Sequence, residues 1–187
     1  MIASLERMGD FVAFVAKVVF ESVRNPPPVR ATIEASYTIG WRSLPILLVI
    51  SGFVGTNLAV QGYNAFVPLG GQSLVGMFVA LAGVRELAPI LVAAMVAAKA
   101  GTEMASQLAV MRIQEQIDAL EVMAISPHWY LVTPRILGIL IMLPALTMIC
   151  ILNLIVCSYL VSVYQLGLDG GEFLALFAAT TRVQDLG

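Results

Sequence analysis

The residues best suited to chemistry in this sequence are the few charged side chains that interrupt its long apolar tracts. Arg85 and Glu86 lie together within "GMFVALAGVRELAPILVAAMV". A charge placed in hydrocarbon costs roughly 2.5 to 3.5 kcal/mol on insertion scales, so such residues normally face a cavity or each other. A guanidinium group also matches the geometry of a phosphate. We therefore expect Arg85 to line a cavity and contact a phosphate, with Glu86 holding Arg85 or a partner subunit in place. The alternative leaves both residues solvated at the outer interface.

A second pair of charges, Lys99 and Glu103, lies one helical turn apart further along the same tract. Oppositely charged side chains four residues apart on a helix are close enough to interact. We expect a structural ion pair, within the helix or between subunits, rather than direct contact with lipid.

Small residues repeat every four positions along the same predicted helix, at Ala93, Ala97, Gly101, Ala105 and Ala109. Such a stripe lets two helix backbones approach closely in lipid, where apolar side chains gain little from association. Packing against another span of the same chain is the favoured interpretation. Packing against a second copy across a two-fold axis is the alternative.

The segment "EQIDALEVMAISP" (115–127) is polar between two apolar tracts, and it carries Glu115, Asp118 and Glu121. Ile113, Ile117, Leu120 and Ala124 recur at helical spacing and form an apolar stripe. Pro127 disfavours helix at the preceding residue and so marks the end. We predict a short amphipathic helix that offers an apolar face and an acidic rim to a soluble partner. A solvated connector resting on lipid headgroups is the alternative.

Other kinds of chemistry find little support in the sequence. There is one histidine, His128, and the two cysteines lie in one apolar tract, so we predict no metal site and no catalytic residues. No G-x-x-x-x-G-K-[ST] loop for binding nucleotide phosphates is present. We therefore expect no cofactor on this chain, and any ATP would be bound by a partner subunit.

The elements that must position these residues are helices in lipid. Hydrophobic residues make up 59% of the chain and charged residues 12%, about half the share of a typical soluble domain. Apolar stretches long enough to span a bilayer lie at about 43–61, 73–111 and 136–164. We predict an all-α, polytopic membrane protein with three complete transmembrane helices. Its predicted segments are interfacial or elbow helices (1–42), spans one and two (43–111), the amphipathic helix (112–127), span three (128–165), and a periplasmic-side helix or the start of a fourth span (166–187).

The first residues follow a different pattern. Phe11, Phe14, Val15 and Val18 recur at helical spacing, with charged residues opposite, until three prolines end the segment at 26–28. Such a helix lies along a membrane surface more readily than it spans. Lys and Arg precede span one and flank the acidic segment, and the other connections lack them. The positive-inside rule therefore places the N-terminus and the acidic helix in the cytoplasm.

The block from Arg85 to Arg135 resembles the signature region of MlaE-type permeases, the membrane subunits of ABC transporters that move lipids with MCE-domain proteins. The shared elements are "REL-P" at 85–89, a basic residue and glycine at Lys99 and Gly101, "EQIDALEVM", Pro127, and "LV-PR" ending at Arg135. The similar "VQGY" at 60–63 and the amphipathic N-terminus extend the resemblance along nearly the whole chain. Two positions depart from the family, which usually has Arg at Lys99 and commonly an acidic residue at Gln107.

The resemblance implies roles for these residues and partners for the chain. Glu115, Ile117, Asp118, Leu120 and Glu121 would belong to a coupling helix that lies in a groove of a cytoplasmic ATPase subunit, while Arg85 and Glu86 would bind lipid. The chain would work as a homodimer in the bacterial inner membrane, move phospholipids with a periplasmic MCE-domain protein, and so maintain outer-membrane lipid asymmetry. Family members usually have five spans, so we expect this sequence to be a fragment.

Three other interpretations remain open from sequence. A non-transporting scaffold could dock a cytoplasmic protein through the same acidic helix. A secondary transporter is a weaker alternative, because no internal repeat is visible. An enzyme is the weakest, since no pairing of a nucleophile with a base is found.

Overall fold

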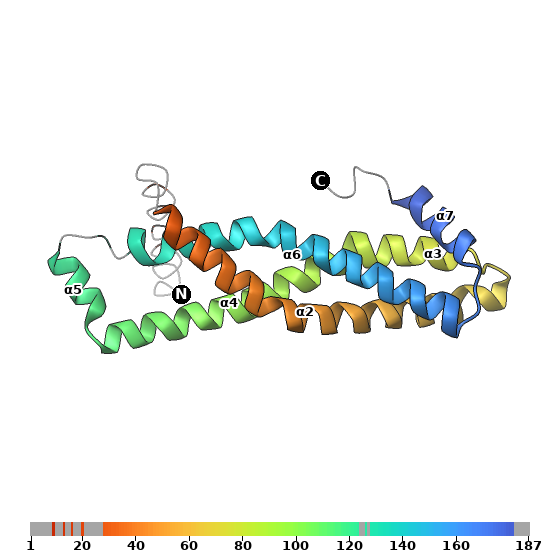
Figure 1. Ribbon diagram of the computed structural model, residues 1–187, viewed down its shortest axis with the longest axis horizontal. Helices are drawn as coiled ribbons and strands as arrows, with labels where there is room; N and C mark the ends of the chain where they lie inside the picture. Colours follow the sequence, from red (N-terminus) through yellow and green to blue (C-terminus); the bar gives the residue numbers. More distant parts are fainter. Residues whose placement is uncertain are drawn as a thin grey trace. The chain divides into compact units, whose positions relative to one another are not determined.

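The computed structural model describes Gly9, Ala13, Ala16 and Phe20 and the ranges 28–123, 126 and 128–181. Every regular element in these ranges is a helix (Figure 1). This confirms the all-α prediction. Most of the predicted amphipathic helix at the N-terminus lies outside the described residues, as do residues 182–187.

Three helical stretches are long and apolar enough to cross a membrane, which agrees with the three predicted spans. They are Val29–Leu69, Leu74–Ile113 and Trp129–Gln165. The first comprises α2 (Val29–Phe66) and a short 3-10 turn, η1 (Val67–Leu69). The helix α2 therefore begins well before Ser43, the predicted start of span one, and it continues through Pro45.

The second stretch changes helix type along its length. It begins with α3 (Leu74–Phe78), continues as the π-helix η2 (Val79–Leu87) and ends as α4 (Ala88–Ile113). The amide of Ala88 donates to the carbonyl of Gly83, five residues earlier. A proline has no N–H and its ring crowds the carbonyl four residues before it, and a π-bulge is one way for a helix to accommodate this. Pro89 follows η2 by two residues, and the helix just before this proline is a π-helix.

The third stretch begins and ends with π-helical turns. It consists of η3 (His128–Val132), α6 (Thr133–Leu160) and η4 (Val161–Gln165). The remaining helices are shorter: α5 (Gln116–Val122) and α7 (Gly170–Thr180). The helix α7 is apolar, and its 11 residues are too few to count as a membrane span.

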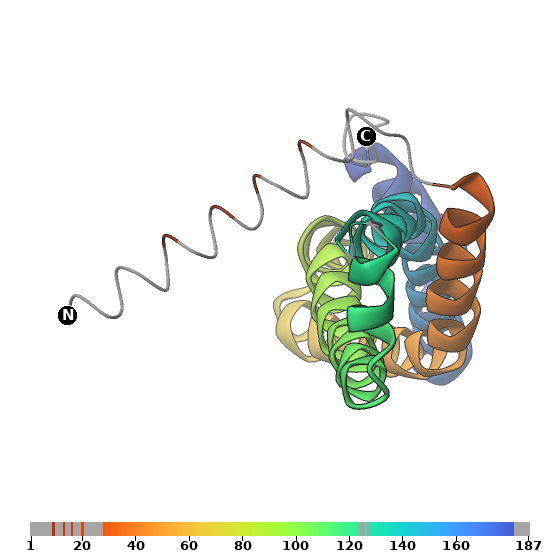
Figure 2. The ribbon, with the colours of Figure 1, turned by 90° about the vertical axis from the view of Figure 1, so that its left-hand side faces the viewer.

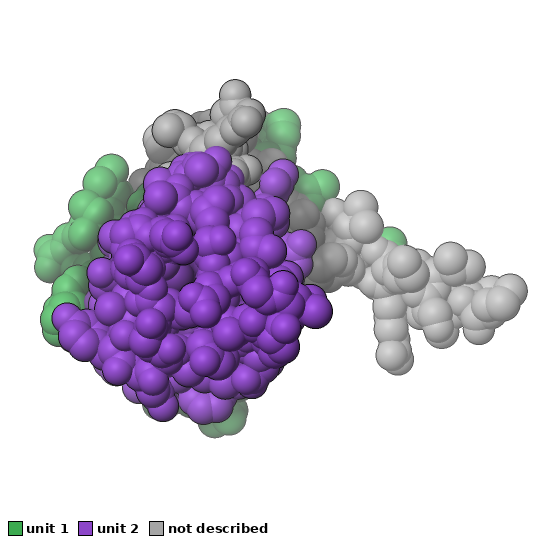
Figure 3. Space-filling model, turned by 90° about the vertical axis from the view of Figure 1, so that its right-hand side faces the viewer, with its two compact units in different colours: residues 1–41, 99–142 green, residues 42–98, 143–187 purple. Residues whose placement is uncertain are grey.

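The chain divides into two compact units, and it passes between them within α2, α4 and α6. Unit 1 comprises Met1–Trp41 and Lys99–Met142, and unit 2 comprises Arg42–Ala98 and Leu143–Gly187 (Figure 3).

The core of unit 2 forms where α7 packs against α3 (Figure 1). Its buried residues are Leu58, Val75, Val79, Leu154, Leu168 and Phe173. Glycines permit the closest contacts: a Cβ at Gly55 would lie 2.5 Å from the carbonyl oxygen of Leu154, and one at Gly76 would overlap the carbonyl of Phe173. Small residues at such crossings are the usual means of packing helices in lipid.

A polar contact also joins two helices in unit 2. The Nδ2 atom of Asn153 on α6 donates to the carbonyl of Leu48, at 2.9 Å, and to the Oγ of Ser51, at 2.8 Å, both on α2. Hydrogen bonds of this kind stabilise helix association where water is absent.

In unit 1, the start of α6 packs closely on the start of α2. A Cβ at Gly138 would lie 3.0 Å from the amide nitrogen of Ser36, and one at Gly40 would overlap the side chain of Met142. The short helix α5 belongs to the same unit and is turned away from the axis of α4 (Figure 2).

Candidate functional site

Arg85 and Glu86 lie on the π-helix η2, and both side chains are exposed. The opposite side of η2 is buried in unit 2 through Val79, Ala80, Gly83 and Val84. A Cβ at Gly83 would lie 2.9 Å from Leu154, so η2 is held closely against α6. A π-turn contains an extra residue per turn, and it often marks a functional site. Here it holds two adjacent charges on the exposed side of a tightly packed helix.

Lys99 and Glu103 lie one turn apart on α4, within unit 1, and both are half-buried. Glu103 lines a pocket described below, and Lys99 does not. Their pairing stays a prediction.

The small-residue stripe on α4 is exposed. The exposed residues are Ala93, Ala97, Gly101 and Ala105. A Cβ added at Gly101 would have no atom of the described residues within 4 Å. The described residues therefore leave the stripe uncovered. Its use in helix packing stays a prediction.

The acidic segment forms a separate helix, α5, as its sequence pattern predicts. Glu115 has a left-handed backbone (φ 57°), which is uncommon for a residue with a side chain and makes the turn between α4 and α5. An Nη1 of Arg112 lies 3.4 Å from the carboxylate of Asp118, and this ion pair ties α5 to the end of α4. The side chain of Glu121 lies outside the described part of the structure.

Apolar side chains on and beside α5 are unusually exposed. Val122 is 88% exposed and Ile113 82%, and Met123 is also exposed, whereas Ile117 and Leu120 are half-buried. Three exposed apolar residues beside Asp118 and Glu115 make a surface of mixed apolar and acidic character. We call Ile113, Glu115, Asp118, Val122 and Met123 the α5 surface.

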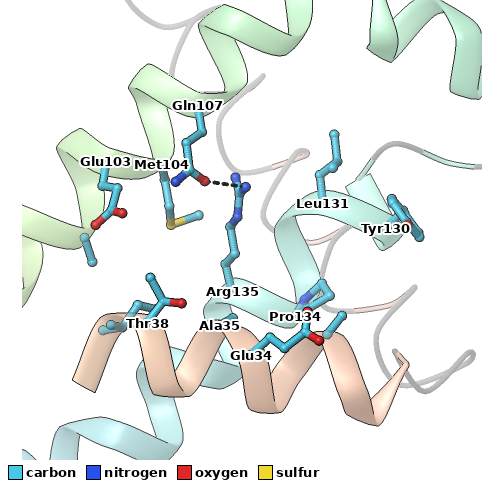
Figure 4. Close-up of a pocket in the computed structure, with 13 residues that line it drawn as sticks. Glu34, Ala35, Thr38, Glu103, Met104, Gln107, Tyr130, Leu131, Pro134 and Arg135 are labelled. Atoms are coloured by element: carbon cyan, nitrogen blue, oxygen red, sulfur yellow. Dashed lines mark hydrogen bonds between the residues drawn. The ribbon is translucent and has the colours of Figure 1, made fainter. Parts of the chain in front are cut away.

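A pocket of about 290 Å³ lies within unit 1, between the start of α2, the second half of α4 and the beginning of α6. Most of its lining is apolar, and its ionisable residues are Glu34, Glu103, Tyr130 and Arg135. Figure 4 shows the Arg135 side chain extending from α6 toward Gln107 on α4. Among the described residues, no group of three or more His, Cys, Asp and Glu side chains could hold a metal ion.

The contact between Arg135 and Gln107 is a hydrogen bond, in which Nη2 of Arg135 donates to Oε1 of Gln107 at 2.7 Å. The other terminal nitrogen, Nη1, is buried and has no hydrogen-bond partner among the described residues. Glu103 acts on the guanidinium electrostatically from the same pocket. Arg135 is therefore a half-buried cation whose hydrogen-bonding capacity is only partly used.

The family model "Permease MlaE" matches residues 32–187 of this chain. The chain belongs to the MlaE permease family. The matched range contains the π-helix η2, α5 and every residue that lines the pocket except Ala31.

Similar proteins come from several groups of organisms. A probable ABC transporter permease protein of Rickettsia felis is 34% identical over 169 residues, which is 90% of this chain and 65% of the relative. The intermembrane phospholipid transport system permease protein MlaE of Haemophilus influenzae is 31% identical over 170 residues, 91% of this chain and 64% of the relative. The chloroplastic protein TRIGALACTOSYLDIACYLGLYCEROL 1 of Arabidopsis thaliana is 34% identical over 134 residues, 72% of this chain and 38% of the relative. This chain thus spans slightly less than two thirds of the first two relatives.

Arg135 lines the pocket in this MlaE family member, and the sequence alone predicts no role for it. The sequence places it in the "LV-PR" block and gives Gln107 as a departure from the family's acidic residue. The two residues are 28 positions apart, and only the packing of α6 on α4 reveals their contact. No spacing or motif in the sequence links the two residues.

Proposed function

We propose that this chain is the permease subunit of an ATP-driven ABC transporter that moves phospholipids. The observation that carries the proposal is the α5 surface, which lies on and directly beside a short helix that connects two stretches long enough to span a membrane, in a chain of the MlaE family. The printed name of the relative from Haemophilus influenzae, which describes phospholipid transport, supports the choice of substrate.

The α5 surface is the proposed contact for a separate ATPase subunit in the cytoplasm. Its apolar residues suit a groove, and its carboxylates suit basic residues at the rim. The ion pair between Arg112 and Asp118 and the tight turn at Glu115 join α5 to α4. When nucleotide binding closes the ATPase, a rigid displacement of α5 would move α4, and with it the spans attached to unit 1.

Arg85 and Glu86 are the proposed lipid-binding residues. Their exposure on a π-helix that is otherwise held against α6 supports this assignment. In this role the Arg85 guanidinium binds the lipid phosphate through paired hydrogen bonds, and Glu86 keeps the arginine oriented.

The remaining parts of the assembly follow from the same proposal. A second copy of the chain packs along the exposed small-residue stripe of α4, because close backbone approach suits such a stripe. The complex lies in the bacterial inner membrane with the N-terminus in the cytoplasm, works with a periplasmic MCE-domain protein and maintains outer-membrane lipid asymmetry.

Purification of the full-length protein with its ATPase tests the contact through α5. Replacing Glu115, Asp118 and Glu121 by Gln, Asn and Gln should prevent stable association and abolish ATP hydrolysis by the complex. Replacing Glu172, an exposed acid on α7, by Gln is the matched control and should change neither. Normal association of the triple variant would show that α5 is not the coupling helix.

A measurement of bound lipid separates transport from a scaffold that only docks a cytoplasmic protein. The wild-type complex should retain phospholipid on purification, and Arg85→Ala should retain much less. A complex that carries no lipid, or whose lipid content is unchanged by Arg85→Ala, would favour the scaffold.

A further inference from the structure

The pocket of unit 1 contains a cation that lacks a full set of acceptors. Arg135 donates from Nη2 to the neutral amide of Gln107, and its buried Nη1 has no hydrogen-bond partner among the described residues. A buried donor without an acceptor is unfavourable, because it has lost its hydrogen bonds to water. An anionic oxygen is the acceptor that a guanidinium binds most strongly.

The same pocket also contains negative charges. Glu103 lies on its α4 wall and Glu34 on its α2 wall, where Glu34 also pairs with Arg30 at 3.0 Å. With Arg135, these two carboxylates give the pocket both signs of charge. A ligand with only negative charges would meet Arg135 favourably and the two carboxylates unfavourably. A ligand that carries a phosphate and an ammonium group would match all three.

The size of the pocket limits what part of such a ligand can enter. Its volume of about 290 Å³ is at the lower end of the range for small-molecule sites, roughly 300 to 1,000 Å³. This suits a lipid headgroup and excludes a pair of acyl chains. Met104, which is long and flexible, lines the same pocket, and a flexible lining side chain lets a pocket adapt to a ligand.

We propose that this pocket binds a phosphoethanolamine headgroup, at a site separate from Arg85 and Glu86. Arg135 binds the phosphate, and Glu103 binds the ammonium group. The inference rests on the proposed function only in its choice of a phospholipid as the source of the headgroup. It adds a headgroup preference and a second lipid site on the permease.

Titration of soluble headgroups tests this proposal with the full-length protein in a maltoside detergent, which carries no phosphate. The probes are glycerophosphoethanolamine, glycerophosphoglycerol and inorganic phosphate, and phosphorus NMR measures each dissociation constant. Glycerophosphoethanolamine should bind most tightly. Arg135→Gln should weaken its binding about tenfold, the effect of losing one charge-assisted hydrogen bond. Arg112→Gln, which removes an arginine of unit 1 outside the pocket, should leave the dissociation constant unchanged.

Two further variants separate binding from folding and assign the ammonium contact. Gln107→Glu supplies Arg135 with a carboxylate, so it should keep the fold and still weaken binding of every phosphate probe. Glu103→Gln should weaken glycerophosphoethanolamine and strengthen inorganic phosphate, because it removes a contact for the ammonium and a repulsion for the anion.

The proposal is overturned if Arg135→Gln and Gln107→Glu bind glycerophosphoethanolamine as the wild type does. It is also overturned if inorganic phosphate or glycerophosphoglycerol binds as tightly as glycerophosphoethanolamine, since Glu103 would then have no role. Lipid retention that depends on Arg85 would persist in either case and would leave the proposed transport function standing. If the wild-type complex retains no phospholipid while the pocket still binds the soluble headgroup, the transport function is contradicted and the headgroup site is not.

Discussion

Arg135 at the start of α6 donates a 2.7 Å hydrogen bond to Gln107 on α4, and so joins two helices on either side of α5. The chain leaves α4 for α5 and returns to begin α6, so this bond closes the loop that contains α5. A displacement of α5 would therefore be resisted by two contacts, Arg135 with Gln107 and Arg112 with Asp118.

Gln107→Glu should stabilise the protein. The substitution replaces a neutral acceptor by a carboxylate beside a half-buried guanidinium, and the added charge should contribute about 0.5 to 1 kcal/mol to the free energy of unfolding. Thermal unfolding in detergent measures the effect as a higher midpoint. A lower midpoint would mean that Glu103 and Glu34 already oppose any further negative charge in the pocket.

Asp118→Asn should leave the fold intact and impair coupling. The Arg112–Asp118 pair is more than half exposed on both sides, and such pairs contribute at most about 1 kcal/mol. Loss of the pair should loosen α5 on α4, so that lipid-stimulated ATP hydrolysis by the complex falls while the unfolding midpoint stays nearly constant. Glu172→Gln removes an exposed acid on α7, and its rate of ATP hydrolysis serves as the comparison. Equal rates in both variants would remove Asp118 from the coupling mechanism.

Gly55→Ala and Gly101→Ala should have opposite effects on stability. A methyl group at Gly55 would lie 2.5 Å from the carbonyl of Leu154, and overpacking of this kind costs typically about 1 to 3 kcal/mol. A methyl group at Gly101 meets no atom of the described residues within 4 Å, and alanine favours a helix over glycine by up to about 1 kcal/mol. Denaturation in mixed micelles measures the change in the free energy of unfolding for both variants. Similar destabilisation by the two substitutions would mean that another part of the protein covers Gly101.

The small-residue stripe on α4 is also the proposed contact between two copies of the chain. Gly101→Leu places a large side chain on an exposed helix face, so it should not unfold the chain, yet it should block close approach of a second copy. Size measurement in detergent should show a loss of dimer. A dimer that persists with this substitution must form through another surface.

Asn153→Leu should destabilise unit 2 modestly. The asparagine donates to Leu48 and Ser51 across two helices, and interhelical hydrogen bonds in membranes are worth about 0.6 to 1.7 kcal/mol. Unfolding in mixed micelles measures the loss. Asn57→Leu is the control, because Asn57 is exposed and its hydrogen bond to Gln61 stays within one helix. Equal effects of the two substitutions would show that the hydrogen bonds donated by Asn153 do not contribute to the free energy of unfolding.

The main elements of this fold could be predicted because their signals are local. Long apolar tracts predict the three spanning stretches, and the Ile117–Leu120 spacing with Pro127 predicts α5. The π-helix η2 could not be predicted, because apolar periodicity does not distinguish a hydrogen bond to the fifth residue from one to the fourth; Pro89 gave the only hint. The pocket could not be predicted either, since Glu34, Gln107 and Arg135 come from three segments that only packing brings together. Such contacts depend on tertiary structure, which sequence spacing does not contain.

We propose that this chain moves phospholipid when its partner hydrolyses ATP. The direct test is transfer of a labelled phospholipid by proteoliposomes that contain the complete complex, with wild type, Arg85→Lys and Arg85→Ala compared. We predict transfer that requires ATP, falls in Arg85→Lys because the paired hydrogen bonds are lost, and is nearly absent in Arg85→Ala. Transfer that does not depend on ATP, or that is equal in all three proteins, would contradict the account.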